Sequence, residues 1–525
     1  MVTKKKSTKE AEVEVKRKKK KKSKIEEVEK KVKKKKKVDP ELAHAMKNIM
    51  DVHLEDKAND EYYKYGIAVI EDRAIFGSID GLKPVARRAL WAAHEMGLRH
   101  NSKADKSAKV VGDTLGNYHP HGDQACYGAI VTAANSPVAL VDGEGNWGTM
   151  NDPAAAYRYT NMRLSKYADT VFFDKFYLPT VDYIPNYDGS KREPLILPSL
   201  LPNAILNGNF GITPGVNTRT PSFTLPSVMK VLRAALEAGE CTPKMCMSLV
   251  FSTKYGGRAL INKEEFSKFF KSGKGKVMFE STHTEPNTKN EIRYDCFAPI
   301  SDIAKTLAKI DSIPGVASTR DDSDKLDKYQ VAYVVTFVKT LKGDALKQAI
   351  RKVQAAFSAS WQFSVQVTDR TLKEDGSAKV KLKPTTIPKL IQQWIDYRIA
   401  LEVRACEYWM KERQKQIAHQ ELLRKAIKMI DFLFKAVKTK GSREDYYNYI
   451  AKGMKINFDE AKVVGNLPLV SLRSMEDKDL VAKIKELQAE YDTYEGRKKN
   501  PKKYIAKHLE TLAAISFDKP KKKKK

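Results

Sequence analysis

Cysteine is scarce in this chain. Its 525 residues hold five cysteines, spread along the sequence without the paired spacing of a metal site. Cys241 and Cys246 lie close in sequence, but no second Cys or His pair lies near them. The pattern argues against a zinc site and favours a reducing compartment.

Long apolar runs and nucleotide-binding motifs are absent as well. No stretch reaches the length that crosses a membrane, and the charged N-terminus lacks the apolar core of a secretory signal, so we expect no membrane association. The glycine-rich residues 143–148 have neither the lysine nor the spacing of a phosphate loop, and are typical of a wing or turn. No Glu…Asp-x-Asp cluster of the metal-binding type is present. We therefore expect no metal ion and no cofactor bound by this chain itself.

Basic residues are abundant and unevenly distributed. The formal net charge is +31, of which residues 1–38 supply +13 (nineteen Lys/Arg, six Asp/Glu) and residues 516–525 supply +5 (six Lys, one Asp). Such tails cannot bury enough apolar surface to fold, so both are predicted to be disordered. Solubility, targeting and attraction to a polyanion are all consistent with such tails, and the sequence does not choose among these roles. Because the body keeps about +13, nucleic acid is the leading partner.

Residues 39–165 are predicted to form an N-terminal arm followed by a helical DNA-binding domain. Pro84 occupies a favoured first-turn position, and Gly97 is a favoured stop. Helices are predicted over residues 85–96, 107–116 and 123–134. Three short helices with basic residues at their starts are typical of a helix-turn-helix or winged-helix unit, although the turn is longer than usual.

Residues 166–385 show short apolar runs, many prolines and alternating segments, which predict an α+β unit. Within it, Gly208 and Gly211 permit close backbone approach, and Ile212 follows directly. An exposed isoleucine there would act as an apolar wedge between base steps. A plain core position for Ile212 is the alternative.

Residues 386–515 are predicted to form two long helices around a small globule. Apolar residues repeat at 3-4 spacing after Pro388, with Arg398 as the one polar interruption, and helix formers return over residues 478–490. This pattern favours an antiparallel coiled coil with a head. We expect the head to carry a dimer contact.

Arg158 stands directly before Tyr159, after a run of small residues. A phenol is a poor nucleophile until a neighbouring cation favours its phenolate, and arginine can serve both the phenolate and a phosphate. An ordinary buried Arg-Tyr pair is the simpler interpretation of the dipeptide alone.

Several motifs, in order along the chain, together resemble one family. It is the breakage-reunion subunit of type IIA DNA topoisomerases, which includes the A subunit of DNA gyrase, the ParC subunit of topoisomerase IV and phage-encoded equivalents. The resembling segments are residues 73–75, 80–88, 118–123, 141–146, 154–160, 180–183, 186–189 and the Ile212 loop, with thinner matches at 320–324 and 467–487.

The resemblance implies a winged-helix domain, a tower domain over residues 166–385 and a coiled coil ending in an exit-gate dimer contact. It makes Tyr159 the nucleophile that forms a transient 5′-phosphotyrosyl link. It assigns catalytic support to Arg158, His121 and His119, with His121 the better match. The residues expected to hold DNA are Arg73, Lys83, Arg87, Arg88, Lys109 and the wedge Ile212.

The same resemblance implies a homodimer within an A2B2 assembly. The partner B-type subunit would carry the ATPase and the TOPRIM domain, and would bind Mg²⁺ and ATP. The expected substrate is double-stranded DNA, which is relaxed or decatenated, while introduction of supercoils is not expected. The implied location is the cytoplasm or nucleoid, the host cytoplasm for a phage protein, or the nucleus for a eukaryotic virus.

Two other classes compete with this interpretation. An architectural DNA-binding protein would keep the basic tails and the wedge without using Tyr159. A tyrosine recombinase would place its tyrosine near the C-terminus, whereas Tyr159 lies early in the chain.

Overall fold

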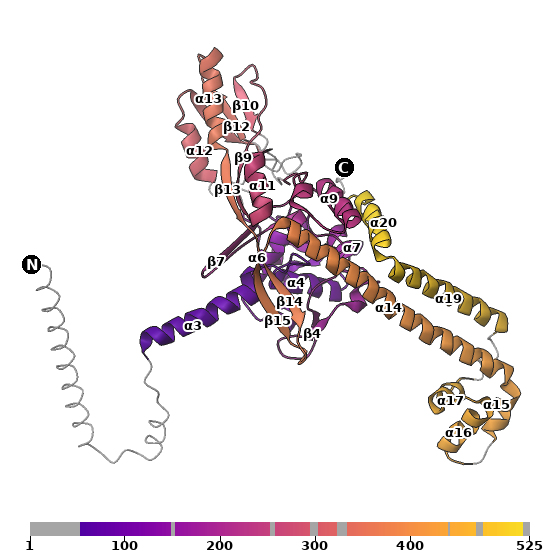
Figure 1. Cartoon of the computed structure of the whole chain (residues 1–525). Helices are drawn as coiled ribbons and strands as arrows, with labels where there is room; N and C mark the ends of the chain where they lie inside the picture. Colours follow the sequence, from indigo (N-terminus) through magenta and orange to yellow (C-terminus); the bar gives the residue numbers. More distant parts are fainter. Residues whose placement is uncertain are drawn as a thin grey trace, which may run out of the picture. The chain divides into compact units, whose positions relative to one another are not determined.

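Figure 1 shows the computed structural model of the chain, which describes residues 53–148, 153–252, 258–294, 303–322, 333–438, 441–468 and 476–517. The chain divides into two compact units, residues 1–65 and 66–525. The lysine-rich segments 1–38 and 518–525 lie outside the described residues, so their predicted disorder stays a prediction. Among the described helices, none is both long enough and apolar enough to span a bilayer.

In the first unit the structure describes the start of helix α3 (Leu54–Val69). Exposed ion pairs one turn apart join Lys57 to Glu61 at 2.7 Å and Lys64 to Asp60 at 2.6 Å. Such exposed pairs are screened by solvent and stabilise a helix only weakly. This segment is therefore a solvated helix.

In the second unit, three helices pack on a small antiparallel sheet. Pro84 starts the first helix, and the observed ends lie within one residue of the predicted ones. The strand order is β1-β3-β2, with Asp105 opposite Met162 and Val141 opposite Leu164. The elements are α4 (Pro84–Glu95), α5 (Ser107–Asn117), α6 (Asp123–Ala134), β1 (Asp105–Lys106), β2 (Val141–Glu144) and β3 (Asn161–Leu164).

Short elements connect this part to the next sheet. The sequence predicted a wing or turn at residues 143–148, and the structure shows that β2 extends through its first two residues. The connecting elements are the π-helical turn η1 (Ile70–Ala74), the 3-10 turns η2 (Tyr157–Tyr159) and η3 (Leu178–Thr180), helices α7 (Lys166–Phe172) and α8 (Asn203–Asn207), and the paired strands β4 (Tyr183–Pro185) and β5 (Arg192–Pro194).

A five-stranded antiparallel sheet follows, in the order β6-β7-β13-β9-β8. Its buried face is rich in phenylalanine; Phe251, for example, packs on Phe223, Phe266 and Phe363. The strands are β6 (Asn209–Thr213), β7 (Val216–Thr220), β8 (Arg258–Leu260), β9 (Lys274–Glu280) and β13 (Ala359–Ser364), and the helices are α9 (Leu225–Ala238), α10 (Pro243–Cys246) and α11 (Lys263–Ser272).

A smaller sheet, in the order β10-β12-β11, has a core of its own around Tyr294, Tyr333 and Phe357. A long β-hairpin leads from the five-stranded sheet towards the last helices. These elements are β10 (Glu291–Tyr294), β11 (Val316–Asp321), β12 (Tyr333–Phe337), α12 (Ile303–Asp311), α13 (Gly343–Ala356), β14 (Gln366–Leu372) and β15 (Ala378–Pro384).

Helix α14 (Ile387–Lys428) and helix α19 (Asp477–Lys499) lie side by side and run in opposite directions (Figure 1). Lys498 pairs with Glu407 near one end of the pair, and Arg424 pairs with Asp477 near the other. The predicted antiparallel arrangement of the two helical runs is therefore observed. Helix α20 (Pro501–Ala514), which the sequence did not predict, follows α19.

Three short helices form the head that was predicted between the two runs. They are α15 (Ile430–Val437), α16 (Arg443–Met454) and α17 (Phe458–Gly465), and they share one apolar core with the end of α14. Ser442 with Asp445 and Asn457 with Glu460 form capping boxes at the starts of α16 and α17. Helix α14 ends at Lys428 with Met429 as its C-cap, and Phe434 lies on α15, where it is 47% exposed.

Candidate active site

Tyr159 lies at the end of a 3-10 turn and is 66% exposed. The Arg158 guanidinium lies 4.8 Å from the centre of the Tyr159 ring. As hydrogen-bond donor and as positive charge, Arg158 holds the pKa of the Tyr159 phenol below its usual value. The buried Arg-Tyr pair that was the simpler interpretation is therefore wrong, because both side chains are exposed. The irregular turn lets two neighbours in sequence meet.

The turn is fixed by hydrogen bonds on both sides of Tyr159. Tyr127 on α6 donates to the Ala155 carbonyl at 2.9 Å and lies 2.9 Å from the Thr160 hydroxyl. Thr160 in turn donates to Ser107 at the start of α5 at 2.8 Å. Buried hydroxyl groups of α5 and α6 therefore hold the backbone on both sides of the exposed phenol.

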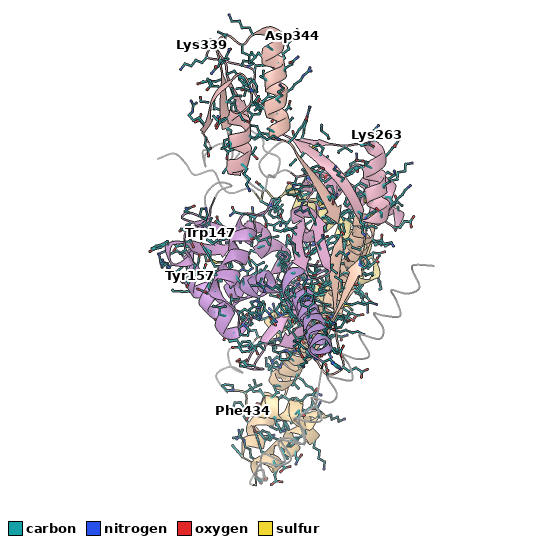
Figure 2. All side chains as sticks on the ribbon, turned by 90° about the vertical axis from the view of Figure 1, so that its left-hand side faces the viewer. Trp147, Tyr157, Lys263, Lys339, Asp344 and Phe434 are labelled. Atoms are coloured by element: carbon teal, nitrogen blue, oxygen red, sulfur yellow. The ribbon has the colours of Figure 1, made fainter. Side chains whose placement is uncertain are left out.

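Tyr157 anchors the same turn to the start of α6. Its hydroxyl donates to Asp123 at 2.8 Å, and its ring packs edge-on against Tyr127, which also contacts Trp147. Figure 2 labels Tyr157 and Trp147 in the same part of the chain. Asp123 follows His121 and Gly122, so one helix start joins the tyrosine turn to the histidine segment. No hydrogen bond or ion pair joins Tyr159 to His119 or His121 within the described part of the chain.

His119 and His121 stack on each other at a centroid distance of 4.3 Å. His119 is buried, whereas His121 is exposed. Burial first, and then the charges of Arg88, His121 and Arg73, lower the pKa of His119 to about 4. Arg88 can only donate, so its 3.0 Å contact with Nδ1 makes that nitrogen the acceptor and leaves the proton on Nε2.

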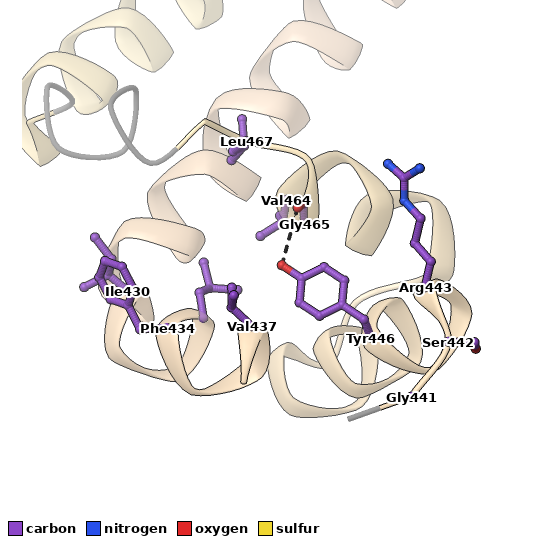
Figure 3. A pocket seen from close by; sticks show the side chains of 11 residues that line it. Ile430, Phe434, Val437, Gly441, Ser442, Arg443, Tyr446, Val464, Gly465 and Leu467 are labelled. Atoms are coloured by element: carbon purple, nitrogen blue, oxygen red, sulfur yellow. Dashed lines mark hydrogen bonds between the residues drawn. The ribbon is translucent and has the colours of Figure 1, made fainter. Parts of the chain in front are cut away.

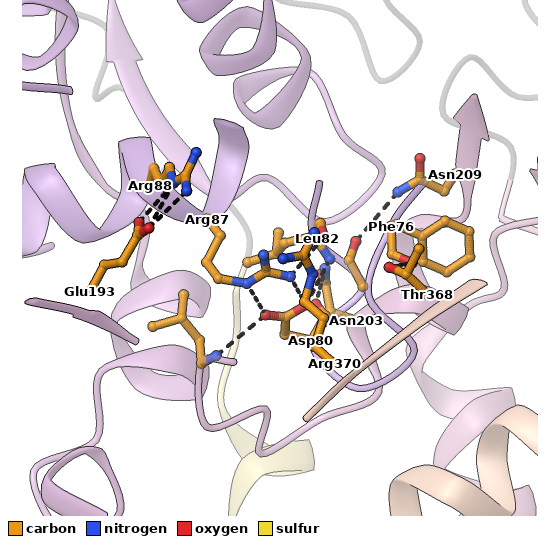
Figure 4. Close-up of polar contacts among 12 residues, drawn as sticks. Phe76, Asp80, Leu82, Arg87, Arg88, Glu193, Asn203, Asn209, Thr368 and Arg370 are labelled. Atoms are coloured by element: carbon orange, nitrogen blue, oxygen red, sulfur yellow. Dashed lines mark hydrogen bonds and ion pairs between the residues drawn. The ribbon is translucent and has the colours of Figure 1, made fainter. Parts of the chain in front are cut away.

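Arg88 lies on α4 and is half-buried. Its guanidinium donates to both carboxylate oxygens of Glu193, at 2.7 and 2.8 Å among others (Figure 4). Glu193 is itself buried. Nothing in the sequence marks Glu193 as the partner of Arg88. The two residues lie far apart along the chain, and Glu193 belongs to the two-stranded β4–β5 sheet. Sequence reasoning missed it for that reason.

Arg87 was expected to face DNA, and the structure does not place it there. Its side chain is buried and forms a two-pronged pair with Asp80, at 2.5 and 2.9 Å (Figure 4). It also donates to the Leu82 carbonyl, and Asp80 accepts from the Leu197 backbone N–H. With its donors used inside the protein, Arg87 holds the loop before α4 instead of a phosphate.

Lys83 and Ile212 are brought together by the β6–β7 hairpin. Lys83 Nζ donates to the Phe210 carbonyl at 2.6 Å, and burial lowers the pKa of Lys83. Ile212 lies on β6 opposite Asn217 and is 65% exposed, so the core alternative for Ile212 is wrong. Gly211 approaches η1 so closely that a Cβ there would lie 2.2 Å from the Ala74 carbonyl oxygen.

The remaining basic candidates are exposed. Arg73 lies on η1 beside this hairpin, and Lys109 on α5 pairs with Asp105 at 2.7 Å. A surface pair of this kind is weak, so Lys109 can exchange Asp105 for another anion. Within the described residues there is no group of three His, Cys, Asp or Glu side chains able to hold a metal ion.

The chain belongs to the family of the A subunits of DNA gyrase and topoisomerase IV, whose sequence model matches residues 73–512. It is 30% identical over 456 residues to the A subunit of DNA gyrase from Thermotoga maritima, covering 83% of this chain and 55% of that protein. It is also 30% identical over 456 residues to the A subunit of DNA topoisomerase 4 from Salmonella typhimurium, covering 84% of this chain and 58% of that protein. The chain thus spans about half the length of these curated relatives.

Proposed function

We propose that this chain is the DNA-cleaving and rejoining subunit of an ATP-dependent type II DNA topoisomerase. The observation that carries the proposal is the exposed Tyr159 phenol, with its pKa lowered by Arg158, on a turn that α5 and α6 hold rigid. Membership in the family of gyrase and topoisomerase IV A subunits supports it. An architectural DNA-binding role would not require this arrangement.

The proposed reaction is a reversible transesterification. The Tyr159 oxygen loses its proton and attacks a backbone phosphorus, the bond from phosphorus to the 3′ oxygen breaks, and that oxygen takes up a proton. A 5′-phosphotyrosyl link and a free 3′ hydroxyl result. One phosphate ester replaces another, so the 3′ hydroxyl can attack in reverse and reseal the strand. Arg158 would stabilise charge on the phosphorane; one donor of this type is typically worth about 3–4 kcal/mol.

Several groups would hold the DNA around Tyr159. The three helices and small sheet would act as a winged helix, His121 and the neutral His119 would bond a phosphate oxygen or move a proton, and Ile212 would enter a base step. Lys83, Arg73, Lys109 and Arg88 would contact neighbouring phosphates. For Arg88 this requires that it share its guanidinium with Glu193, so its contribution is the smallest.

The proposed assembly is A2B2, in which a B-type subunit supplies the ATPase site and the Mg²⁺ beside the scissile phosphate. The head would provide the contact between two copies of this chain. It has a cavity of about 460 Å³, between α15 and the loop before α16, whose lining includes Phe434, Val437 and Tyr446 (Figure 3). Val437 is 62% exposed. Exposed apolar groups around a cavity suit a self-complementary contact.

Cleavage of DNA by Tyr159 is tested with the chain, its partner subunit and magnesium, quenched with detergent. Wild-type protein should leave protein attached to DNA 5′ ends, and Tyr159→Phe should bind DNA equally well and leave none. Tyr187→Phe is the matched control, because Tyr187 is also exposed (52%). Covalent product from Tyr159→Phe would refute the enzymatic proposal and leave the architectural role.

The dimer contact is tested by sedimentation. Val437→Asp should increase the monomer fraction, because it places a charge in an apolar contact. Leu372→Asp, at an exposed residue (44%) of the β14–β15 hairpin, should not. Equal behaviour of the two variants would place the dimer contact elsewhere.

A further inference from the structure

Phe210 is an exposed aromatic residue that the proposed mechanism leaves unused. It lies two residues before Ile212 on β6, so both side chains leave the same face of the strand. Phe210 is 48% exposed and Ile212 is 65% exposed. A duplex that Ile212 enters therefore passes within reach of the Phe210 ring.

Arg219, on the neighbouring strand, packs against the Phe210 ring. The two residues are direct partners in the β6–β7 ladder. The Arg219 guanidinium lies 4.6 Å from the centre of the Phe210 ring and 4.8 Å from that of Trp361 on β13. Both distances are within the range of cation–π attraction, so the two rings hold the guanidinium in place.

The edge of that guanidinium is not used. Arg219 contacts the two rings, and it makes no hydrogen bond or ion pair with any residue that the structure describes. Its five N–H donors are thus available to an anion from outside, and a stacked, planar guanidinium suits a phosphate. The hairpin beneath is braced by the Lys83 bond to the Phe210 carbonyl and by the packing of Gly211 on Ala74.

We propose that Phe210 and Arg219 form a second DNA contact beside the Ile212 wedge, in which the ring packs on the sugar and base edge and the guanidinium binds the adjacent phosphate. This inference rests on the proposed function, because it needs a duplex bent over the β6–β7 hairpin. It adds an aromatic and a cationic contact to a wedge that otherwise consists of one isoleucine.

The test measures binding and bending of a duplex by energy transfer between dyes on its two ends, using the full chain. Phe210→Ala should raise the Kd roughly 5-fold or more, the lower range for an aromatic group stacked on nucleic acid, and should reduce bending. Phe210→Leu should give a Kd and a bend between those of wild type and those of Phe210→Ala. Arg219→Gln should weaken binding and reduce the slope of log Kd against log salt by about 1, as for one lost phosphate contact.

Met278→Ala is the matched control, because Met278 is a 43% exposed apolar residue on β9 of the same sheet. It should bind and bend DNA as wild type does. Each variant's thermal unfolding is compared with wild type, so that a collapsed hairpin is recognised, and Phe210→Leu then serves as the deciding variant.

The outcomes separate this inference from the proposed function. If wild type neither binds nor bends the duplex, the proposed function fails. If wild type bends DNA and Ile212→Ala does not, while Phe210→Ala, Phe210→Leu and Arg219→Gln behave as wild type, only the second contact is overturned. An equal loss in Met278→Ala also overturns it.

Discussion

At the scale of residues, the role of each arginine depends on whether it contacts a carboxylate or the Tyr159 phenol. Arg158 has no carboxylate partner within the described residues, and it lies against Tyr159. Arg87 is instead paired with Asp80 in the interior. Two arginines in family motifs thus have opposite roles because one is exposed and the other is buried.

Arg158→Gln should move the pH dependence of cleavage. Arg158 lowers the pKa of Tyr159, so its removal raises that pKa, and the rising limb of the rate against pH should shift to higher pH. The rate at neutral pH should also fall roughly 100-fold, as for loss of one preorganised donor. Arg158→Lys keeps the charge, so its pH profile should shift less than that of Arg158→Gln. An unchanged profile for Arg158→Gln would show that Arg158 does not act on the phenol.

Arg87→Ala should destabilise the protein by about 3–5 kcal/mol, because it leaves the Asp80 carboxylate buried without its counter-charge. Urea unfolding measures this. Arg88→Ala should lower the free energy of unfolding by less than Arg87→Ala does, since the Arg88 guanidinium is partly solvated. A small stability loss for Arg87→Ala together with a large loss of DNA affinity would restore the original expectation of a DNA contact.

At the scale of elements, a buried charged cluster joins α14 to α19, α20 and the segment before η3. Arg398 on α14, Arg497 on α19 and Tyr177 all donate to Glu402 or to one another. His508 on α20 completes the cluster through Arg398. Burial alone would raise the pKa of Glu402, but the charge of Arg398, with the bonds from Tyr177 and Arg497, keeps it below its usual value.

Glu402→Gln should therefore destabilise the chain by about 3–5 kcal/mol, because two arginines lose their common counter-charge in a buried site. Denaturant unfolding followed by circular dichroism measures the loss. Glu412→Gln, which removes the partner of the exposed Lys415, should change the free energy of unfolding far less, because solvent screens that pair. Equal losses would mean that the cluster does not hold the helix junction.

At the scale of the whole molecule, three histidines lie in separate parts of the second unit and share one property. Burial lowers the pKa of His94, His119 and His508 to about 4, from 6.5. His94 stacks on Phe173, His119 lies beside Arg88, and His508 contacts Arg398. The fold therefore keeps all three neutral at pH values where the unfolded chain would protonate them.

The free energy of unfolding should decrease as the pH falls from about 6.5 to 4. In that window the unfolded chain binds protons that the folded chain does not, so the stability present above pH 6.5 is lost on acidification. Urea unfolding at several pH values measures the slope. His508→Gln keeps an acceptor for Arg398 and should remove about a third of the histidine contribution to that slope. An unchanged slope would show that His508 is already accessible to protons.

Local sequence signals predicted much of the helical structure. Pro84 and Gly97 mark helix ends that the structure reproduces, because proline and glycine act through the nearest backbone groups. Ser107 begins α5 but was wrongly predicted to cap it, since the N-cap is Lys106 and the Ser107 hydroxyl accepts from Thr160 instead. The apolar spacing after Pro388 predicted a long helix, and Ile391, Trp394 and Leu401 are buried on it as expected. The end of α14 at Lys428 and the existence of α20 were not predicted, since neither is marked by a strong local signal.

The sequence by itself determined the order of the elements, the basic character of the chain and the motif that places Arg158 before Tyr159, because these are properties of neighbouring residues. Only the tertiary structure decided which charges are exposed. It paired Arg87 with Asp80, Arg88 with Glu193 and Arg497 with Glu402, and it placed Arg219 against two rings. Several of these partners come from distant segments or neighbouring strands, and burial depends on everything packed around a group, so no spacing along the chain encodes them.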